Sequence, residues 1–147
     1  MKIDEITIAI IKHLRDGRKS FREIAEDLSL SENTIRGRVA RMKDEGLLDI
    51  AGWVDPQHLP GHAVVMIGVS LKGMDLVSKA EEFSRLRGVV SVSVVTGRFD
   101  LIVTVLLGEG FGILEFYTQE ASRLEGVGSV ETFVVYKAFN LRVPYVL

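Results

Sequence analysis

Cysteine is absent from this chain of 147 residues, so it can form neither disulfides nor thiolate metal sites. The absence of disulfides fits a reducing cytoplasm. No apolar run is long enough for a transmembrane helix, and no basic-then-apolar signal sequence opens the chain. We therefore expect a soluble, cytoplasmic protein that has no membrane partner.

A strong charge of either sign is also missing. The chain has 18 Lys and Arg against 20 Asp and Glu, which gives a net charge of −2. This balance argues against a protein that coats nucleic acid without regard to sequence. It remains compatible with a sequence-specific DNA-binding protein, because a local basic patch matters more than the total charge. Hydrophobic residues make up 47%, which is enough for one ordinary domain or two small ones.

Features typical of catalytic or metal sites are scarce. His58 and His62 are four residues apart, but Pro60-Gly61 prevents the helix that would align them as metal ligands. The glycine-rich stretch 108–112 lacks the spacing of nucleotide-binding loops, so we interpret it as a strand-to-helix turn. No nucleophile stands beside a base, and no pair of carboxylates stands out. We expect no catalytic residues, no metal and no cofactor.

Three short helices are predicted near the N-terminus. Apolar residues spaced three to four apart predict the first helix over residues 2–15. Ser20 and Glu23 fit a capping box, which begins the second helix. The link Ser29-Leu30 is so short that the second and third helices should form a helix-turn-helix pair.

The third helix is the one that we expect to enter a DNA major groove. Ser31 fits its N-cap, and Gly46 fits the left-handed position after its last turn. Its outer side carries amide, hydroxyl and guanidinium groups, which suit base edges and phosphates. A merely solvated charged face is the alternative, but the capped helix pair and its tight turn favour DNA binding. The predicted DNA-binding residues are Arg22, Ser31, Asn33, Thr34, Arg36, Arg38 and Arg41.

The segment after the third helix predicts a wing and a domain boundary. Two short strands are expected within residues 47–54, beside the three helices. Asp55-Pro56 and Pro60-Gly61 then interrupt regular structure. We place a winged helix-turn-helix domain at residues 1–56, a hinge at 57–61 and a second domain at 62–147.

The second domain alternates strands and helices in the order βαββαβ, the ferredoxin-like split unit, so the fold class is α+β. Strands are predicted at 63–71, 89–96, 101–107 and 127–138, and helices at 74–86 and 111–124.

An internal repeat supports two similar halves. Ser84–Val92 and Ser122–Val130 differ at only two of nine positions, and both run from a helix end through glycine into a strand. Chance similarity between two such turns is the alternative.

Helices cover only one face of such a sheet. Residues 90–97 and 133–139 carry apolar or small side chains on both faces, and an uncovered apolar face normally marks an interface. We expect a homodimer in which two sheets pack face to face, or a larger closed assembly of such dimers.

Taken in order, these segments resemble the leucine-responsive and asparagine-responsive (Lrp/AsnC) regulators of bacteria and archaea. The resemblance rests on the helix-turn-helix at 4–48, the hinge-like Val54-Asp55-Pro56, the turn Val95–Leu101 that reads VTGRFDL, and the last strand from Gly126 to Thr132. It implies a transcription regulator that forms dimers and often octamers. It also implies an amino acid or similar small effector, bound between subunits near residues 97–100.

The resemblance further implies which residues bind the effector. Gly97 would allow close approach to the backbone, and Asp100 would meet an α-amino group or orient the turn. The turn also fits an ordinary hairpin, because glycine accepts positive φ and aspartate bonds locally in turns. The implied effector-binding residues are Thr96, Gly97, Arg98, Asp100 and Thr132.

Two alternatives share this architecture. Sirohaem decarboxylases resemble the family but are associated with histidines near the turn that reads TGRFD here, and this chain has no histidine after His62. A metabolite-binding module without DNA binding is the other alternative, and the arginine-rich third helix argues against it. The prediction is a sequence-specific regulator of transcription that is controlled by an amino-acid-like effector and is not an enzyme.

Overall fold

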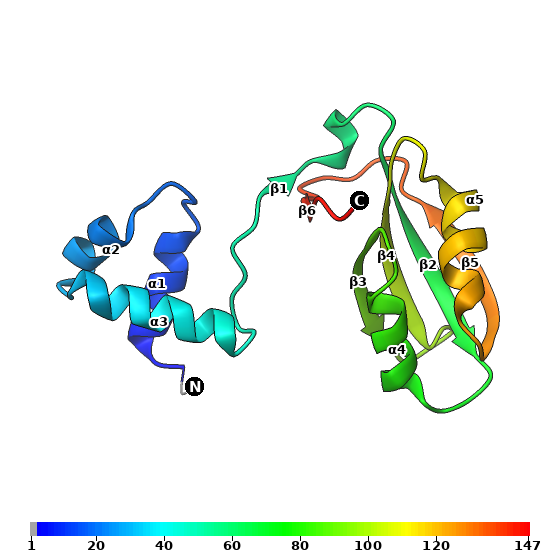
Figure 1. Ribbon diagram of the computed structural model, residues 1–147, viewed down its shortest axis with the longest axis horizontal. Helices are drawn as coiled ribbons and strands as arrows, with labels where there is room; N and C mark the ends of the chain where they lie inside the picture. The colour runs from blue at the N-terminus through cyan, green and yellow to red at the C-terminus, as the bar shows by residue number, and fades with distance from the viewer. Residues whose placement is uncertain (1–2) are drawn as a thin grey trace. The chain divides into compact units, whose positions relative to one another are not determined.

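The computed structural model describes residues 3–147, which form two compact units that divide between Ala51 and Gly52 (Figure 1). Each unit has a hydrophobic core of its own. None of the helices within residues 3–147 has the length and apolar composition needed to cross a bilayer.

The first unit consists of three helices, as predicted: α1 (Glu5–Leu14), α2 (Phe21–Leu28) and α3 (Glu32–Asp44). A side chain caps the start of each one. The Asp4 carboxylate accepts from the Thr7 N–H at 2.8 Å, and the Ser31 hydroxyl accepts from the Thr34 N–H at 3.1 Å. The Ser20–Glu23 capping box is formed in full. Because caps satisfy donors that a short helix leaves free, they define where each helix begins.

The core of this unit draws on all three helices. Ile10, Ile24 and Ile35, one from each helix, are completely buried. Val39 and Met42 of α3 join them, so the predicted apolar stripe of α3 is confirmed. The opposite side of α3 is thereby turned toward solvent.

The wing predicted within residues 47–54 is not formed. The N–H groups of Leu47 and Leu48 bond back to the carbonyl of Met42, and the fully described stretch Asp49–Gly52 has no regular secondary structure. The next two residues form β1 (Trp53–Val54), which pairs antiparallel with β6 (Val143–Pro144) near the other end of the chain. This pairing places residues 52–56 with the second unit, although we expected them in the first domain.

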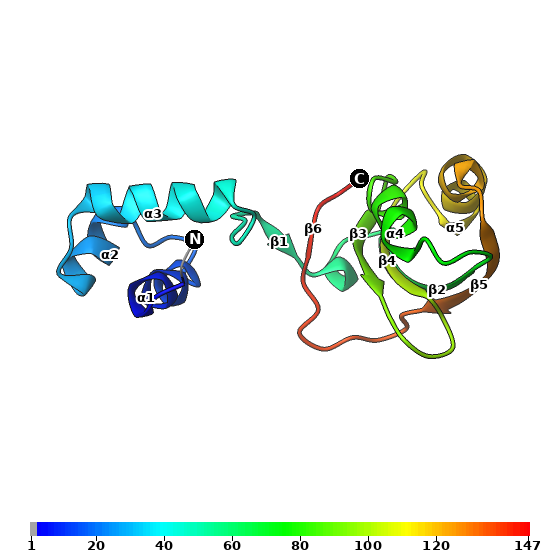
Figure 2. The ribbon, with the colours of Figure 1, turned by 90° about the horizontal axis from the view of Figure 1, so that it is seen from below.

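The second unit is a four-stranded antiparallel sheet in the order β3-β4-β2-β5, which confirms the ferredoxin-like prediction. Its helical segments lie on one face of the sheet (Figure 2). The elements are β2 (Ala63–Leu71), α4 (Leu76–Ser84), β3 (Val89–Val94), β4 (Leu101–Leu107), α5 (Ile113–Glu115) and β5 (Val127–Val134).

The helix predicted at 111–124 is not a continuous α-helix. α5 passes into a π-helical turn, η2 (Phe116–Glu120), and then into a 3₁₀ turn, η3 (Ala121–Arg123). The hydroxyls of Thr118 and Ser122 each donate to the carbonyl four residues earlier, at 2.8 and 2.7 Å. Such side-chain bonds compete with the regular helical ladder, which hydrophobic spacing alone does not reveal.

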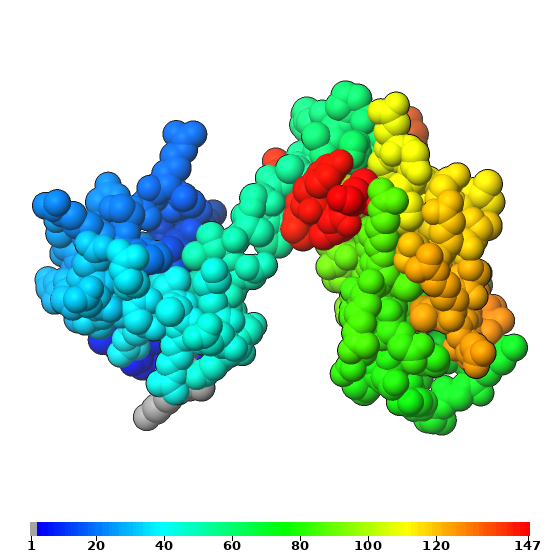
Figure 3. Space-filling model, in the orientation of Figure 1, coloured from blue at the N-terminus to red at the C-terminus, as the bar shows by residue number. Residues whose placement is uncertain are grey.

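The main core lies between the sheet and these helices, where Ile67, Val103 and Phe116 are fully buried. A smaller cluster of Val64, Leu106 and Val143 lies on the other face. The C-terminal segment thus covers one end of the face that we expected to be bare. Figure 3 shows this segment, in red, on the surface of the second unit.

The internal repeat corresponds to two equivalent turns. Gly88 and Gly126 both adopt left-handed backbone conformations, with φ of 81° and 78°. Each turn leads directly into a strand, β3 or β5, as the repeat predicted.

The ends of the strands differ slightly from the prediction. β3 ends at Val94 and β5 at Val134, after which the N–H of Val135 bonds to the carbonyl of Val64. A 3₁₀ turn, η1 (Pro56–His58), begins just before the segment that we predicted as a hinge.

Candidate nucleic-acid interface and effector turn

The turn between α2 and α3 is fixed by one residue with an unusual backbone conformation. Ser29 has a φ of 54°, in the left-handed region, and its N–H bonds to the carbonyl of Glu26. The N–H of Leu30 reaches back to the carbonyl of Ala25 at 2.9 Å, which closes a helix C-cap of the Schellman type. The turn therefore holds the two helices in a defined helix-turn-helix.

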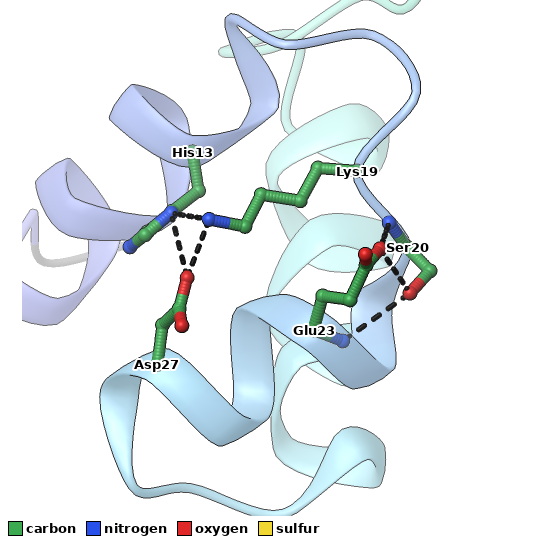
Figure 4. A network of polar contacts seen from close by, with 5 residues as sticks. All are labelled: His13, Lys19, Ser20, Glu23 and Asp27. Atoms are coloured by element: carbon green, nitrogen blue, oxygen red, sulfur yellow. Dashed lines mark hydrogen bonds and ion pairs between the residues drawn. The ribbon is translucent and has the colours of Figure 1, made fainter.

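A polar network ties α2 to the end of α1 (Figure 4). The Lys19 ammonium bonds to the Asp27 carboxylate and lies 2.8 Å from Nδ1 of His13. The hydrogen bond from Lys19, helped by its charge, lowers the pKa of Asp27. Hydrogen bonds from the Ser20 hydroxyl and N–H likewise lower the pKa of Glu23 in the capping box. Sequence reasoning identified the capping box but missed the Lys19–Asp27 pair, which links residues eight apart.

The first turn of α3 presents polar groups to solvent. Ser31, Asn33 and Thr34 are all exposed. The Ser31 hydroxyl is occupied by the cap and by a 2.8 Å hydrogen bond with the Thr34 hydroxyl. Asn33 makes no side-chain hydrogen bond to any of residues 3–147, so both halves of its amide are open to an external partner.

Three of the predicted DNA-binding arginines are exposed, and each pairs with a glutamate four residues away. Arg36 lies 2.5 Å from Glu32, Arg41 lies 2.8 Å from Glu45, and Arg22 lies 3.0 Å from Glu26. The hydrogen bond and charge of Glu26, followed by the charge of Glu32, raise the pKa of Arg22. Glu32 thus interacts electrostatically with Arg22 of α2 and forms an ion pair with Arg36 of α3.

Arg38 differs from these three because it is half-buried and turned toward α1. Its Nη1 donates to both carboxylate oxygens of Asp4, at 2.7 and 2.9 Å, and to the hydroxyl of the buried Thr7 at 3.1 Å. Hydrogen bonds from the Thr7 hydroxyl and N–H, and then from Arg38, hold the pKa of Asp4 far below its usual range. The structure therefore places Arg38 in the contact between α3 and α1.

The predicted effector turn joins β3 to β4 and is anchored by Asp100. The N–H of Asp100 donates to the carbonyl of Val69, and the Asp100 carboxylate accepts from the Leu71 N–H at 2.7 Å. Leu71 follows a shift in the pairing of β2 with β5, which leaves its N–H available to a side chain. We expected Asp100 either to meet an α-amino group or to orient the turn, and its hydrogen bonds to Val69 and Leu71 are those of a residue that orients the turn.

Two aromatic contacts hold the turn against the sheet. The Phe99 ring lies over Gly68 of β2, where an added Cβ would be only 2.6 Å from the ring. The same ring meets Phe133 of β5 edge-on, with centroids 6.1 Å apart. Sequence reasoning did not single out this packing, although a glycine inside a strand pattern is a recognised sign of close approach.

Charged groups lie beside this aromatic pair. Arg98 bonds to Glu131 of β5 at 2.8 Å, and its guanidinium carbon lies 5.4 Å from the centre of the Phe99 ring. Thr132, the next residue along, points to the opposite face of the sheet, where its hydroxyl shares a 2.6 Å hydrogen bond with Tyr117. The structure thus brings residues 96–100 together with Glu131 but separates them from Thr132.

A cavity of about 690 Å³ lies elsewhere in the second unit. It is bounded by residues 55–58, 62–64 and 135–142, and none of the predicted effector residues lines it.

Comparison with known proteins matches both units. Residues 3–43 match the AsnC-type helix-turn-helix domain, and residues 63–144 match the Lrp/AsnC ligand binding domain. The transcriptional regulator Ptr1 of Methanocaldococcus jannaschii is 27% identical over 142 residues, which cover 94% of this chain and 95% of Ptr1. The regulator FL11 of Pyrococcus horikoshii is 28% identical over 137 residues, which cover 92% of this chain and 90% of FL11.

Solved structures share the fold. E. coli AsnC has a TM-score of 0.71 at 24% identity, with 97% of each chain covered. The regulator NMB0573 of Neisseria meningitidis, solved as a complex with L-Met, has a TM-score of 0.71 at 21% identity, with 99% of this chain and 96% of that chain covered. Because both domain types match in the expected order, the chain belongs to the Lrp/AsnC family of transcription regulators, which are DNA-binding proteins and not enzymes.

Proposed function

We propose that this protein binds a specific duplex site as a homodimer, with α3 of each subunit in the major groove. The observation that carries the proposal is the capped first turn of α3, which presents the free amide of Asn33 and the exposed Thr34. In helix-turn-helix proteins the start of the second helix contacts base edges. Asn33 and Thr34 therefore contact bases, while Ser31 maintains the helix cap.

Phosphate contacts come from the exposed arginines around this turn. Arg22 begins α2, and Arg36 and Arg41 lie along α3, so they flank the residues assigned to base edges. Guanidinium groups bind phosphate oxygens through paired N–H donors. Arg38 contributes by orienting α3, because its guanidinium is already bound to Asp4 and Thr7.

Exposed apolar groups on the second unit support the homodimer. Met66 and Phe133 are large apolar residues that remain exposed on the face of the sheet opposite the helices. Tyr136 and Phe139, just beyond β5, are 97% and 84% exposed. Large exposed apolar surface is typical of an interface. A second copy packed on this surface would cover it, and such dimers could assemble into octamers.

An amino-acid-like effector is proposed for the turn at residues 96–100. Arg98 and Glu131 offer one positive and one negative group, which match the carboxylate and ammonium of a free amino acid. Gly97 leaves the backbone accessible, and Asp100 keeps the turn in place. NMB0573, which shares the fold, was solved with L-Met, and this supports the choice of ligand class. Thr132 would take part only indirectly, through Tyr117.

Alanine substitutions test the DNA-binding face. Arg36→Ala and Arg41→Ala should each weaken binding to genomic DNA fragments at moderate salt, as measured by fluorescence anisotropy. Arg85→Ala is the matched control, because Arg85 is also an exposed arginine paired with a glutamate four residues away, but it lies by α4 in the second unit. If the two α3 variants bind DNA as well as the Arg85 variant does, the proposed face is wrong.

A thermal-shift screen of amino acids tests the effector site. At least one amino acid should raise the melting temperature, and Arg98→Ala should abolish that rise without unfolding the protein. Arg123→Ala, a change at another exposed arginine of the same unit, should leave the response intact. The effector proposal fails if no amino acid stabilises the protein, or if the Arg98 variant responds normally.

A further inference from the structure

The two helices that face DNA are not a basic surface. Residues 20–45 contain five basic and six acidic side chains. Non-specific attraction to DNA depends almost entirely on cationic groups that neutralise phosphates. The balanced charge of α2 and α3 therefore differs from a DNA-binding surface that consists mainly of cationic groups.

The arrangement of these charges is specific. Glu32 begins α3 and bonds to Arg36, while its charge also acts on Arg22 of α2. Arg22 in turn bonds to Glu26. Arginine and glutamate thus alternate across the junction of the two helices, beside the residues assigned to base edges. Arg36 additionally lies over the Phe21 ring, with its guanidinium carbon 5.4 Å from the ring centre.

We propose that Glu26 and Glu32 are specificity-determining residues, because they compete with DNA phosphates for Arg22 and Arg36. This inference rests on the proposed function of α3. Each guanidinium must exchange its carboxylate for a phosphate before it can contribute to binding. The exchange weakens contacts with any duplex, whereas base contacts by Asn33 and Thr34 add affinity only at the correct site. The glutamates therefore raise the ratio of specific to non-specific binding.

The exchange also has a consequence for salt dependence. A free guanidinium that binds phosphate releases one condensed counterion, and this makes binding steeply sensitive to salt. When a carboxylate is displaced at the same time, it attracts a cation from solution, which offsets part of that release. The wild-type protein should therefore show a shallower salt dependence than its number of phosphate contacts implies.

The test measures binding of the full-length protein to a short random-sequence duplex by fluorescence anisotropy, between about 50 and 200 mM salt. Glu32→Gln and Glu26→Gln should each raise affinity at low salt by about two- to fivefold, since an exposed pair of this kind is weak but the lost charge also repelled phosphate. The slope of log affinity against log salt should steepen by up to about 0.9 for each substitution. Glu81→Gln is the control, because Glu81 pairs with Arg85 in the second unit and its substitution removes the same charge.

A second pair of variants distinguishes competition for the Arg36 guanidinium from the general effect of removing a negative charge. In an Arg36→Ala background, Glu32→Gln should no longer steepen the slope, because the guanidinium that it would free is gone. The proposal is overturned if Glu26→Gln and Glu32→Gln behave like Glu81→Gln, or if Glu32→Gln still steepens the salt slope in the Arg36→Ala background. A wild-type protein that binds neither this duplex nor genomic fragments would instead refute the proposed function itself.

Discussion

Nη1 of Arg38 lies 2.7 and 2.9 Å from the two carboxylate oxygens of Asp4, a residue 34 positions earlier in the chain. Asp4 is also the N-cap of α1. The Asp4 carboxylate therefore caps the N-terminus of α1 and also binds Arg38 in the middle of α3. Because the buried Thr7 shares this contact, the orientation of α3 depends on the start of α1.

Arg38→Gln should lower the melting temperature of the first unit by a few degrees, because it removes a half-buried charged contact. Its effect on DNA binding should differ from that of Arg41→Ala. Loss of a phosphate contact lowers the salt slope by up to about 0.9, whereas loss of a positioning residue lowers affinity with the slope unchanged. Equal reductions of slope in both variants would show that Arg38 binds phosphate directly.

The stability of the first unit should depend on the ionisation of Asp4. Hydrogen bonds depress its pKa in the folded state, so the carboxylate stabilises the fold above the unfolded pKa of about 3.9. That stabilisation is lost as the pH falls toward the folded-state pKa. Asp4→Asn should therefore be less stable than wild type at neutral pH, and the difference should shrink below about pH 4. Hydrogen exchange of the α1 amides measures the stability of the first unit in both proteins. A stability difference between wild type and Asp4→Asn that does not change with pH would contradict the prediction.

The two glycines of the internal repeat should tolerate alanine differently. A Cβ at Gly88 would lie 2.6 Å from the Phe111 ring and 2.8 Å from the carbonyl oxygen of Leu106, whereas at Gly126 the nearest atom, Cε of Lys79, is 3.5 Å away. Both variants bear the strain of positive φ, but Gly88→Ala should cost about 1–3 kcal/mol more. Urea unfolding of the second unit measures the difference, and equal losses would refute it.

Removal of the Asp100 side chain should destabilise the effector turn. Asp100→Ala leaves the Leu71 N–H without its acceptor, which should cost about 1–3 kcal/mol. Asp100→Asn keeps an oxygen acceptor and should lose much less. Urea unfolding combined with hydrogen exchange at Leu71 distinguishes the two variants. If both unfold alike, the carboxylate does not support the turn in this way.

Local signals in the sequence were enough to predict most of the fold. Caps such as Ser31 and the apolar spacing of α3 depend on residues close in sequence, and so do the apolar segments that predicted β2 and β4. Features set by distant partners were missed. The predicted wing failed because the pairing partner of Trp53–Val54 is Val143–Pro144, and no local pattern links these segments.

The candidate sites show the same division. The exposed first turn of α3 and the anchored turn at Asp100 lie where the sequence placed them. The contact of Arg38 with Asp4 could not be predicted, because an arginine on a helix gives no sign of which distant carboxylate it will meet. Thr132 was grouped with the turn because the family resemblance implied it, yet the alternation of side chains along β5 turns its hydroxyl to the other face of the sheet.

In the proposed dimer, the pairing of β1 with β6 would give residues 143–144 an influence on cooperative DNA binding. Because β6 pairs with β1, residues 49–51 are the stretch without regular structure between the backbone bonds at Leu47 and Leu48 and the start of the second unit at Gly52. Without β6 this tether would lengthen and become more flexible. In a dimer, a longer tether lowers the effective concentration at which the second recognition helix meets its half-site once the first is bound. In the proposed dimer, Val143 and Pro144 would therefore influence avidity, although they are distant in sequence from every residue assigned to DNA.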